Sequence, residues 1–210
     1  MKVLLVNGSP HEKGCTYTAL EEVSKVFNEE GIMTEIFWVG LKPLIGCTAC
    51  RKCQELKRCV FNDRVNDLLK IAGDADGFIF GSPVHYAAAS GAITSFMDRL
   101  FYADMLSGNN SFYLKPAAAV VSARRAGTTS TFDQLNKYFT ISEMPVISSR
   151  YWNMVHGRTP EDVKKDLEGL QTMRILARNM AWFLKCKEEG IKSGVKLPVR
   201  EEVVFTNFIR

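Results

Sequence analysis

Four of the six cysteines lie close together, and thiols at this spacing can hold metal. They follow the pattern Cys-x-x-Cys-x-x-Cys-x5-Cys and are Cys47, Cys50, Cys53 and Cys59. Spacers this short allow one segment to fold around a [4Fe–4S] cluster. Zinc also takes thiolate ligands, and the same cysteines could remain free thiols. The spacing leaves these three alternatives open. The other two, Cys15 and Cys186, are expected to be structural.

A second candidate for chemistry is the loop near the N-terminus. Lys2–Val6 is an apolar run typical of a buried strand, and Asn7-Gly8-Ser9-Pro10 ends it. After a polar loop, apolar residues recur at helical spacing over residues 20–27. Because a helix N-terminus presents unpaired N–H groups and partial positive charge, such a loop suits a phosphate. Ser9 and Thr16 would add hydroxyl donors, although an ordinary strand-to-helix turn is the alternative interpretation.

Two common phosphate-binding motifs are absent from this loop. The P-loop requires Gly-Lys followed by Ser or Thr, whereas here Lys13 precedes Gly14 and Cys15. The dinucleotide fingerprint G-x-G-x-x-G is also missing. We therefore expect a phosphate bound here to belong to another kind of ligand, such as a mononucleotide.

Five strands that alternate with helices are predicted along the chain. The strands are expected at residues 2–6, 34–39, 77–81, 117–121 and 145–147. Asp63 is expected to cap a short helix at 65–72. Thr159 and Pro160 are expected to open a long last helix, whose buried stripe runs over residues 163–184. This alternation favours an α/β fold, with a doubly wound parallel sheet between two helical layers.

The chain is expected to form one main domain. We assign residues 1–187 to it, with a cysteine-rich insertion at 40–61 and a C-terminal extension at 188–210. An apolar content of 46% over 210 residues is enough for a substantial core.

Ligands of a doubly wound sheet bind beyond the carboxyl ends of its strands. Three loops are therefore expected to converge there. They are residues 9–16, 82–90 and 122–127. In the second loop Pro83 fixes the backbone direction, and the small residues 87–91 leave room for a flat ligand. Tyr86 could stack on a ring and His85 could donate to a ring carbonyl, while a tightly packed turn is the alternative.

Composition and charge argue against several classes of partner. The net charge of +4 is mild, and basic residues are mixed with acidic ones, as in residues 161–166. No run reaches the roughly 18 apolar residues of a membrane span, and no signal-peptide pattern precedes the first strand. We expect a cytoplasmic protein with no nucleic-acid or membrane partner. Its cysteines are then expected to be thiols or metal ligands.

Three motifs together resemble a known family. They are Asn7-Gly8-Ser9-Pro10-x-x-x-Gly14-x-Thr16, Phe80-Gly81-Ser82-Pro83-Val84-His85-Tyr86 and Ser95-Phe96-Met97-Asp98-Arg99. At this spacing they resemble the NAD(P)H-dependent FMN reductase family of the flavodoxin-like fold, over roughly residues 1–187. The cysteine spacing is similar to that of iron–sulfur flavoproteins, which share this fold.

The resemblance implies FMN as the cofactor and indicates which residues surround it. The phosphate would lie among Ser9, His11, Cys15 and Thr16. The isoalloxazine ring would contact Pro83, Val84, His85 and Tyr86, although His85 stands where the family often has an aromatic residue. The third flavin-side loop would supply Ser122, Arg124, Arg125 and Gly127. Arg124 or Arg125 could stabilise the negative charge of reduced FMN, or form a surface pair. Trp152, Asn153 and His156, on an expected loop, are weaker candidates for covering the flavin.

The implied activity is hydride transfer from NAD(P)H through FMN to a quinone, a flavin or another small acceptor. Hydride transfer between stacked rings requires no acid or base, so no catalytic residue is expected. By resemblance the protein is expected to be a homodimer or homotetramer. The alternative is an iron–sulfur flavoprotein that carries electrons through a [4Fe–4S] cluster. A receiver-like signalling domain is disfavoured, because Asn7–Ser9 and Ser82–Pro83 stand where it needs acidic residues.

Overall fold

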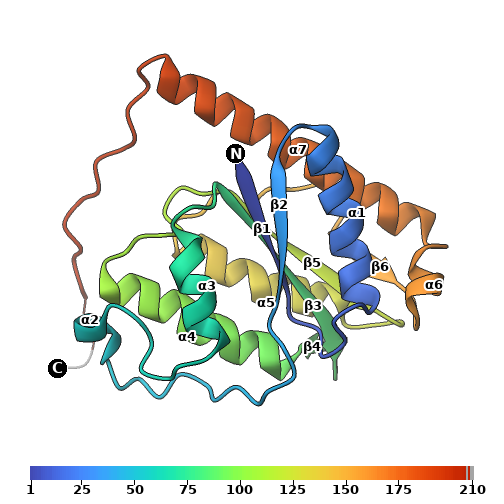
Figure 1. Cartoon of the computed structure of the whole chain (residues 1–210), viewed down its shortest axis with the longest axis horizontal. Coiled ribbons are helices and arrows are strands. Elements are labelled where there is room, and N and C mark those ends of the chain that lie inside the picture. The colour runs from blue at the N-terminus through green and yellow to red at the C-terminus, as the bar shows by residue number, and fades with distance from the viewer. Residues whose placement is uncertain (207, 209–210) are drawn as a thin grey trace.

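The computed structural model describes residues 1–206 and 208, and its centre is a parallel β-sheet covered by helices on both faces (Figure 1). The sheet order is β2-β1-β3-β5-β6. These strands are β1 (Lys2–Asn7), β2 (Met33–Trp38), β3 (Gly77–His85), β5 (Ala117–Ala123) and β6 (Met154–His156). A two-residue strand, β4 (Ala88–Ala89), pairs antiparallel with β3. The predicted five-stranded parallel sheet is thus confirmed, with one short strand added.

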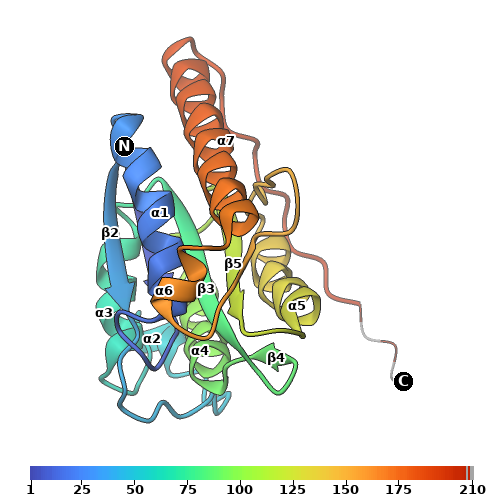
Figure 2. The same ribbon diagram turned by 90° about the vertical axis from the view of Figure 1, so that its right-hand side faces the viewer.

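Side chains of the central strands divide between two cores, because successive residues of a strand point to opposite faces. Val3 and Leu5 of β1 pack in one core with α1 (Cys15–Glu29) and α7 (Leu167–Lys192). Leu4 and Val6 pack in the other, whose helices are α3 (Arg64–Ala72), α4 (Gly91–Ser107) and α5 (Thr128–Ile141). Figure 1 shows the sheet between α1 on one side and α3 and α4 on the other, and Figure 2 views the molecule from the side of α1 and α6. Burial on both faces explains why these strands are continuously apolar.

The last parallel strand lies later in the chain than the sequence predicts. At the predicted position only Val146 pairs, through an isolated bridge to Ala117. The chain then leaves the sheet edge and returns as β6, where the Val121 amide donates to the Asn153 carbonyl at 2.9 Å. In between, Asn153 Nδ2 donates to the carbonyl of Ala119 at 3.0 Å. The buried side-chain amide of Asn153 therefore makes the hydrogen bond to β5 that the backbone of a further strand residue would make. Asn153 thus has a structural role. His156 belongs to β6 and does not lie on the predicted loop.

The predicted long last helix is divided in two. Thr159 caps it as expected, in a capping box with Asp162, and Pro160 is its first residue. This helix, α6 (Pro160–Val163), stops after one turn. The Asp166 side chain then accepts from the Gly169 amide and caps α7, so the break is stabilised by its own N-cap. Leu167, expected in the buried stripe, is 75% exposed as a result.

The remaining segments border the two cores. Within residues 40–61 there is one short helix, α2 (Cys53–Leu56), and the Asp63 side chain caps α3 as predicted. Helix α7 continues through residue 187, the expected domain boundary, to Lys192. Residues 195–206 then run back along the molecule (Figure 1), and residues 207, 209 and 210 of the expected extension lie outside the described residues. Among the described helices, none has the length and apolar character that crossing a membrane would take.

A pair of glycine substitutions tests how the loop after β5 packs. Gly127 and Gly40 have similar left-handed backbones, with φ of +92° and +94°. A Cβ at Gly127 would lie 2.6 Å from Ala87 Cα, whereas one at Gly40 meets no atom within 4 Å. Gly40→Ala should therefore cost about 1–2 kcal/mol of folding free energy through the backbone alone. Gly127→Ala should cost about 1–3 kcal/mol more through overpacking. Urea unfolding measures both; equal costs would contradict the packing of this loop on the β3–β4 turn.

Candidate functional site

The three loops at the carboxyl ends of the strands are joined to one another by direct contacts. Ser90 Oγ donates to the Gly8 carbonyl at 3.2 Å, which ties the second loop to the first. The hydroxyls of Thr16 and Ser122 lie 2.8 Å apart in a buried hydrogen bond, which ties the first loop to the third. Gly127 packs against the turn that holds Ala87, which ties the third loop to the second. The structure thus brings together the three loops that topology predicts to converge.

The first loop is held by hydrogen bonds within it and by one from Trp38 of β2. The Ser9 amide donates to Asn7 Oδ1 at 3.1 Å, and the His11 amide donates to Ser9 Oγ at 3.1 Å. The Ser9 carbonyl accepts from the Trp38 indole at 2.8 Å. Helix α1 then begins at Cys15, with no side-chain cap and no acidic residue in its first turn. An uncapped N-terminus of this kind leaves backbone N–H groups for an anion.

The expected phosphate-side residues differ in their exposure. Ser9 and Thr16 are buried, and His11 is exposed. Cys15 is half-buried, and its thiol donates to the Gly157 carbonyl at 3.6 Å. Burial raises the pKa of the Cys15 thiol, which keeps it protonated. The other cysteine expected to be structural, Cys186, is exposed on α7.

The second loop is a tight turn between β3 and β4. Tyr86 and Ala87 have left-handed backbones, with φ of 49° and 62°, which is strained for residues with a side chain. The Ser130 hydroxyl donates to the Ala87 carbonyl and helps to hold the turn. Pro83 and Val84 are half-buried, whereas His85 and Tyr86 are exposed, Tyr86 completely. Pro83 and Val84 thus lie on the side of the loop that faces the protein, whereas Tyr86 points into solvent.

The third loop follows β5 and contacts the other two. Ser122 is buried and bonds to Thr16, whereas Arg124 and Arg125 are exposed. Gly127 is the N-cap of α5 and takes the left-handed backbone that this close approach requires.

The four clustered cysteines line one small hollow beside α4. We call this the cysteine hollow; its lining includes Cys47, Cys50, Cys53, Cys59, Phe61 and Arg99. Cys53 and Cys59 are 6% and 9% exposed, and Cys47 and Cys50 are exposed. In the described part of the chain, no three His, Cys, Asp or Glu side chains converge closely enough to hold a single metal ion. The four cysteines therefore line the same hollow without converging on one point.

Two of these thiols have opposite pKa shifts. Burial raises the pKa of Cys53, and the neighbouring cysteine sulfurs add to the shift. A hydrogen bond from the Lys52 amide lowers the pKa of Cys50. The exposed Cys50 is thus the more readily ionised of the two.

Arg99 is a functional candidate to which the sequence analysis gave no role. It is 1% exposed, and Nε and Nη2 donate to Cys59 Sγ at 3.3 and 3.2 Å. The same guanidinium forms a two-pronged ion pair with Asp63, at 2.7 and 2.9 Å. A signal was present in the sequence, because Arg99 ends the motif Ser95–Arg99. Asp63 is predicted from the sequence only as a helix cap.

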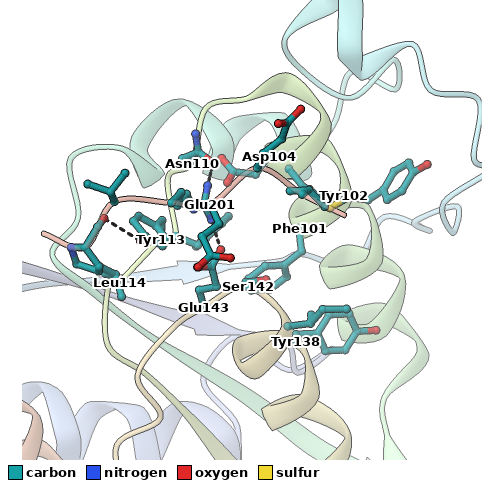
Figure 3. A pocket seen from close by; sticks show the side chains of 18 of the residues that line it. Phe101, Tyr102, Asp104, Asn110, Tyr113, Leu114, Tyr138, Ser142, Glu143 and Glu201 are labelled. Carbon is teal, nitrogen blue, oxygen red and sulfur yellow. Dashed lines mark hydrogen bonds and ion pairs between the residues drawn. The ribbon is translucent and has the colours of Figure 1, made fainter. Parts of the chain in front are cut away.

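A larger cavity, about 1040 Å³ in volume, lies between α4, α5 and the C-terminal segment (Figure 3). Its aromatic lining includes Phe101, Tyr102, Phe112, Tyr113 and Tyr138. The C-terminal segment forms one wall; Arg200 holds it by pairing with Glu143 and stacking 3.8 Å from the Tyr113 ring centre. Cys47 and Tyr102 line both this cavity and the cysteine hollow. The cavity could not be foreseen, since its walls come from segments far apart in sequence.

Comparison with known proteins points to flavin chemistry. The family model described as NADPH-dependent FMN reductase matches residues 1–159. An iron–sulfur flavoprotein of Methanocaldococcus jannaschii is 33% identical over 194 residues, which covers 88% of this chain and 98% of that protein. Four further curated relatives, from M. jannaschii, Methanosarcina thermophila and Archaeoglobus fulgidus, carry the same description.

Solved structures show the same fold at low sequence identity. RosB, solved with bound 8-demethyl-8-formylriboflavin-5′-phosphate, has a TM-score of 0.69 at 15% identity, covering 100% of this chain and 94% of that one. The NAD(P)H:(acceptor) oxidoreductase FerB of Paracoccus denitrificans has a TM-score of 0.63 at 14% identity, covering 88% and 97%. A WrbA-like flavodoxin of Agrobacterium tumefaciens is also similar, with a TM-score of 0.58 at 14% identity, covering 88% and 96%. These likenesses confirm the flavodoxin-like fold.

The opposite pKa shifts of Cys50 and Cys53 predict different reactivity. In reduced, metal-free protein at pH 7–8, iodoacetamide should modify Cys50 well before Cys53, because the thiolate is the nucleophile and Cys50 is exposed. Lowering the pH should slow Cys50 only below its depressed pKa. Timed peptide mass spectrometry measures both rates. Equal rates for the two cysteines would contradict the arrangement of the cysteine hollow.

Proposed function

The chain belongs to the NADPH-dependent FMN reductase family, and on this premise we propose that it is an iron–sulfur flavoprotein. It would take hydride from NAD(P)H at FMN and exchange single electrons through a [4Fe–4S] cluster with a small acceptor. The observation that carries the proposal is the meeting of Cys47, Cys50, Cys53 and Cys59 around one hollow. The iron–sulfur flavoprotein of M. jannaschii supports it across nearly the full length of both chains.

FMN fits the edge where the three loops meet. Its phosphate would lie at the uncapped N-terminus of α1, within reach of the first loop's amides and Ser9. Thr16 would act from below, because its hydroxyl bonds to Ser122 and thereby fixes the third loop beneath the ligand. Bound FMN supplies hydride acceptance and one-electron transfer in the same group.

The protein's part in hydride transfer is to place the ring and favour its reduced charge. The backbone of Pro83 and Val84 would lie along the ring, because this stretch is held at the end of β3 and half-buried. Arg124 and Arg125 are exposed beside it and are free to turn toward a bound anion. Tyr86, wholly exposed on a rigid turn, would contact a ring or a second subunit only from the outer side.

The cysteine side chains that line the cysteine hollow are the donors that an iron–sulfur cluster takes. Four cysteines among the residues lining the hollow supply thiolate sulfurs, which is the usual ligand set of a [4Fe–4S] cluster. The four cysteines line one hollow, and among the described residues no three metal-binding side chains converge on one centre, as a tetrahedral zinc site would need. Hydrogen bonds to sulfur, such as that from Arg99 to Cys59, are typical partners of cluster thiolates. When bound, the cluster would supply one-electron transfer.

A second candidate is an FMN reductase that works without metal. The exposure of Cys47 and Cys50 favours this candidate, because exposed thiols can remain free in solvent. The two candidates share the flavin site and differ only at the cysteine hollow.

Anaerobic purification distinguishes the candidates. The protein should be yellow, release FMN on denaturation, and contain about four iron atoms per chain. Cys50→Ser should lose most of that iron and keep FMN, because Cys50 lies outside the three flavin loops. Cys186→Ser, which changes an exposed cysteine of α7, is the matched control and should keep both. The measurements are the visible spectrum, iron analysis and FMN released.

The possible failures have separate meanings. A colourless protein that does not bind added FMN contradicts the flavin assignment. FMN without iron, even after anaerobic reconstitution, contradicts the cluster and leaves the metal-free reductase. NADPH and NADH are compared by the rate of flavin bleaching under anaerobic conditions.

A further inference from the structure

Arg99 is a charged side chain placed where charge is costly. It lies on α4 with 1% of its surface exposed. A buried guanidinium is destabilising unless its N–H groups are paired. The hydrogen-bond and ion-pair partners of Arg99 therefore indicate which part of the structure this side chain stabilises.

These partners belong almost entirely to the segment around the cysteine hollow. Two N–H groups donate to Cys59 Sγ and two form the ion pair with Asp63. Weaker bonds reach the carbonyls of Ile45 and Phe61 at 3.4 Å. The guanidinium also lies 4.9 Å from the centre of the Phe61 ring. One side chain of α4 thus contacts residues near both ends of the cysteine segment, by which we mean the cysteine-rich insertion at 40–61.

Cys59 is held from its backbone as well. Its amide donates to Asn66 Oδ1 at 2.9 Å, and Asn66 Nδ2 donates back to its carbonyl at 2.9 Å. Asn66 is itself 1% exposed on α3. Among the hydrogen bonds of the described residues, Cys59 alone of the four cysteines accepts from a guanidinium at its sulfur. The four sulfurs are therefore not equivalent.

We propose that Arg99 is a positioning residue that fixes Cys59 Sγ and, balanced by Asp63, sets the reduction potential of the cluster held in the cysteine hollow. The inference rests on the proposed function, because it requires the cluster. It assigns Arg99 and Asp63 a role that a purely structural ion pair would not have.

The two residues should act on the potential in opposite directions. Reduction adds one electron, and so one negative charge, to the cluster and its sulfurs. Hydrogen-bond donors and positive charge near a sulfur stabilise that state and raise the potential. The Asp63 carboxylate offsets the Arg99 charge and so lowers the potential. Loss of Arg99 should lower the potential, and neutralisation of Asp63 should raise it.

Two substitutions test this opposition. Arg99→Gln removes the charge and the paired donors. Asp63→Asn removes the carboxylate charge, yet asparagine still caps α3, because it is as good an N-cap as aspartate. We expect each to shift the midpoint potential by about 59 mV, a tenfold change in a one-electron equilibrium, downward for Arg99→Gln and upward for Asp63→Asn. Anaerobic redox titration followed by EPR gives the potentials, and iron analysis gives cluster occupancy.

Two further variants separate this role from folding. Arg64→Gln is the matched control, because Arg64 is a nearby arginine that bonds to the Trp38 carbonyl and Asp67; it should leave the potential unchanged. Arg99→Lys keeps the charge and loses the planar fork. It should hold the cluster and give a potential between those of wild type and Arg99→Gln.

Each outcome decides the inference. Opposite shifts, with the control unchanged, support it. Unchanged potentials in iron-loaded Arg99→Lys and Asp63→Asn, or shifts of the same sign, overturn it while the proposed function stands. If Arg99→Gln fails to fold, the Arg99→Lys and Asp63→Asn shifts still decide. A wild-type protein that takes up no iron overturns the proposed cluster and this inference with it.

Discussion

Parallel pairing of β1, β3 and β5 is the constraint on which the rest of the structure depends. Because all three strands run in one direction, their carboxyl ends meet at one edge, and the loops that leave them must share that edge. The strands are buried on both faces, which fixes their register and the starting points of those loops. The bonds from Ser90 to Gly8 and from Thr16 to Ser122 then join the loops to one another through groups of the protein. A site joined in this way is pre-organised.

The cysteine segment is held by a different kind of interaction. It lies outside the sheet and has only one short helix, and its packing on the core comes from a few side chains, which are Cys53, Cys59, Leu44 and Phe61. Buried polar groups take over this function: Asn66 binds the backbone of Cys59, and Arg99 binds its sulfur. Such networks are specific because any broken member leaves an unpaired group in a medium of low dielectric. The flavin edge thus depends on sheet geometry, and the cysteine hollow depends on a few charged and amide side chains.

The sequence predicted the parts that depend on local pattern. The continuously apolar strands, the Asp63 and Thr159 caps and the convergence of the three loops followed from residue type and spacing. The interrupted edge strand did not, because it depends on the Asn153 amide reaching the Ala119 carbonyl across the sheet. The break before α7 was missed because Val163 and Leu167 continue the helical spacing, whereas the Asp166 cap ends it. Arg99 was missed because its burial arises only when α4 packs on a segment far away in sequence.

The interruption at β6 also bears on how copies of the chain could assemble. A long, unpaired edge strand is a template on which another chain can add a strand. Here that edge is only Met154–His156, and the chain bulges away from it between Val146 and β6. The amide of Asn153 already occupies the Ala119 carbonyl that a neighbouring strand would need. A strand added on this side would therefore find only Met154–His156 to pair with.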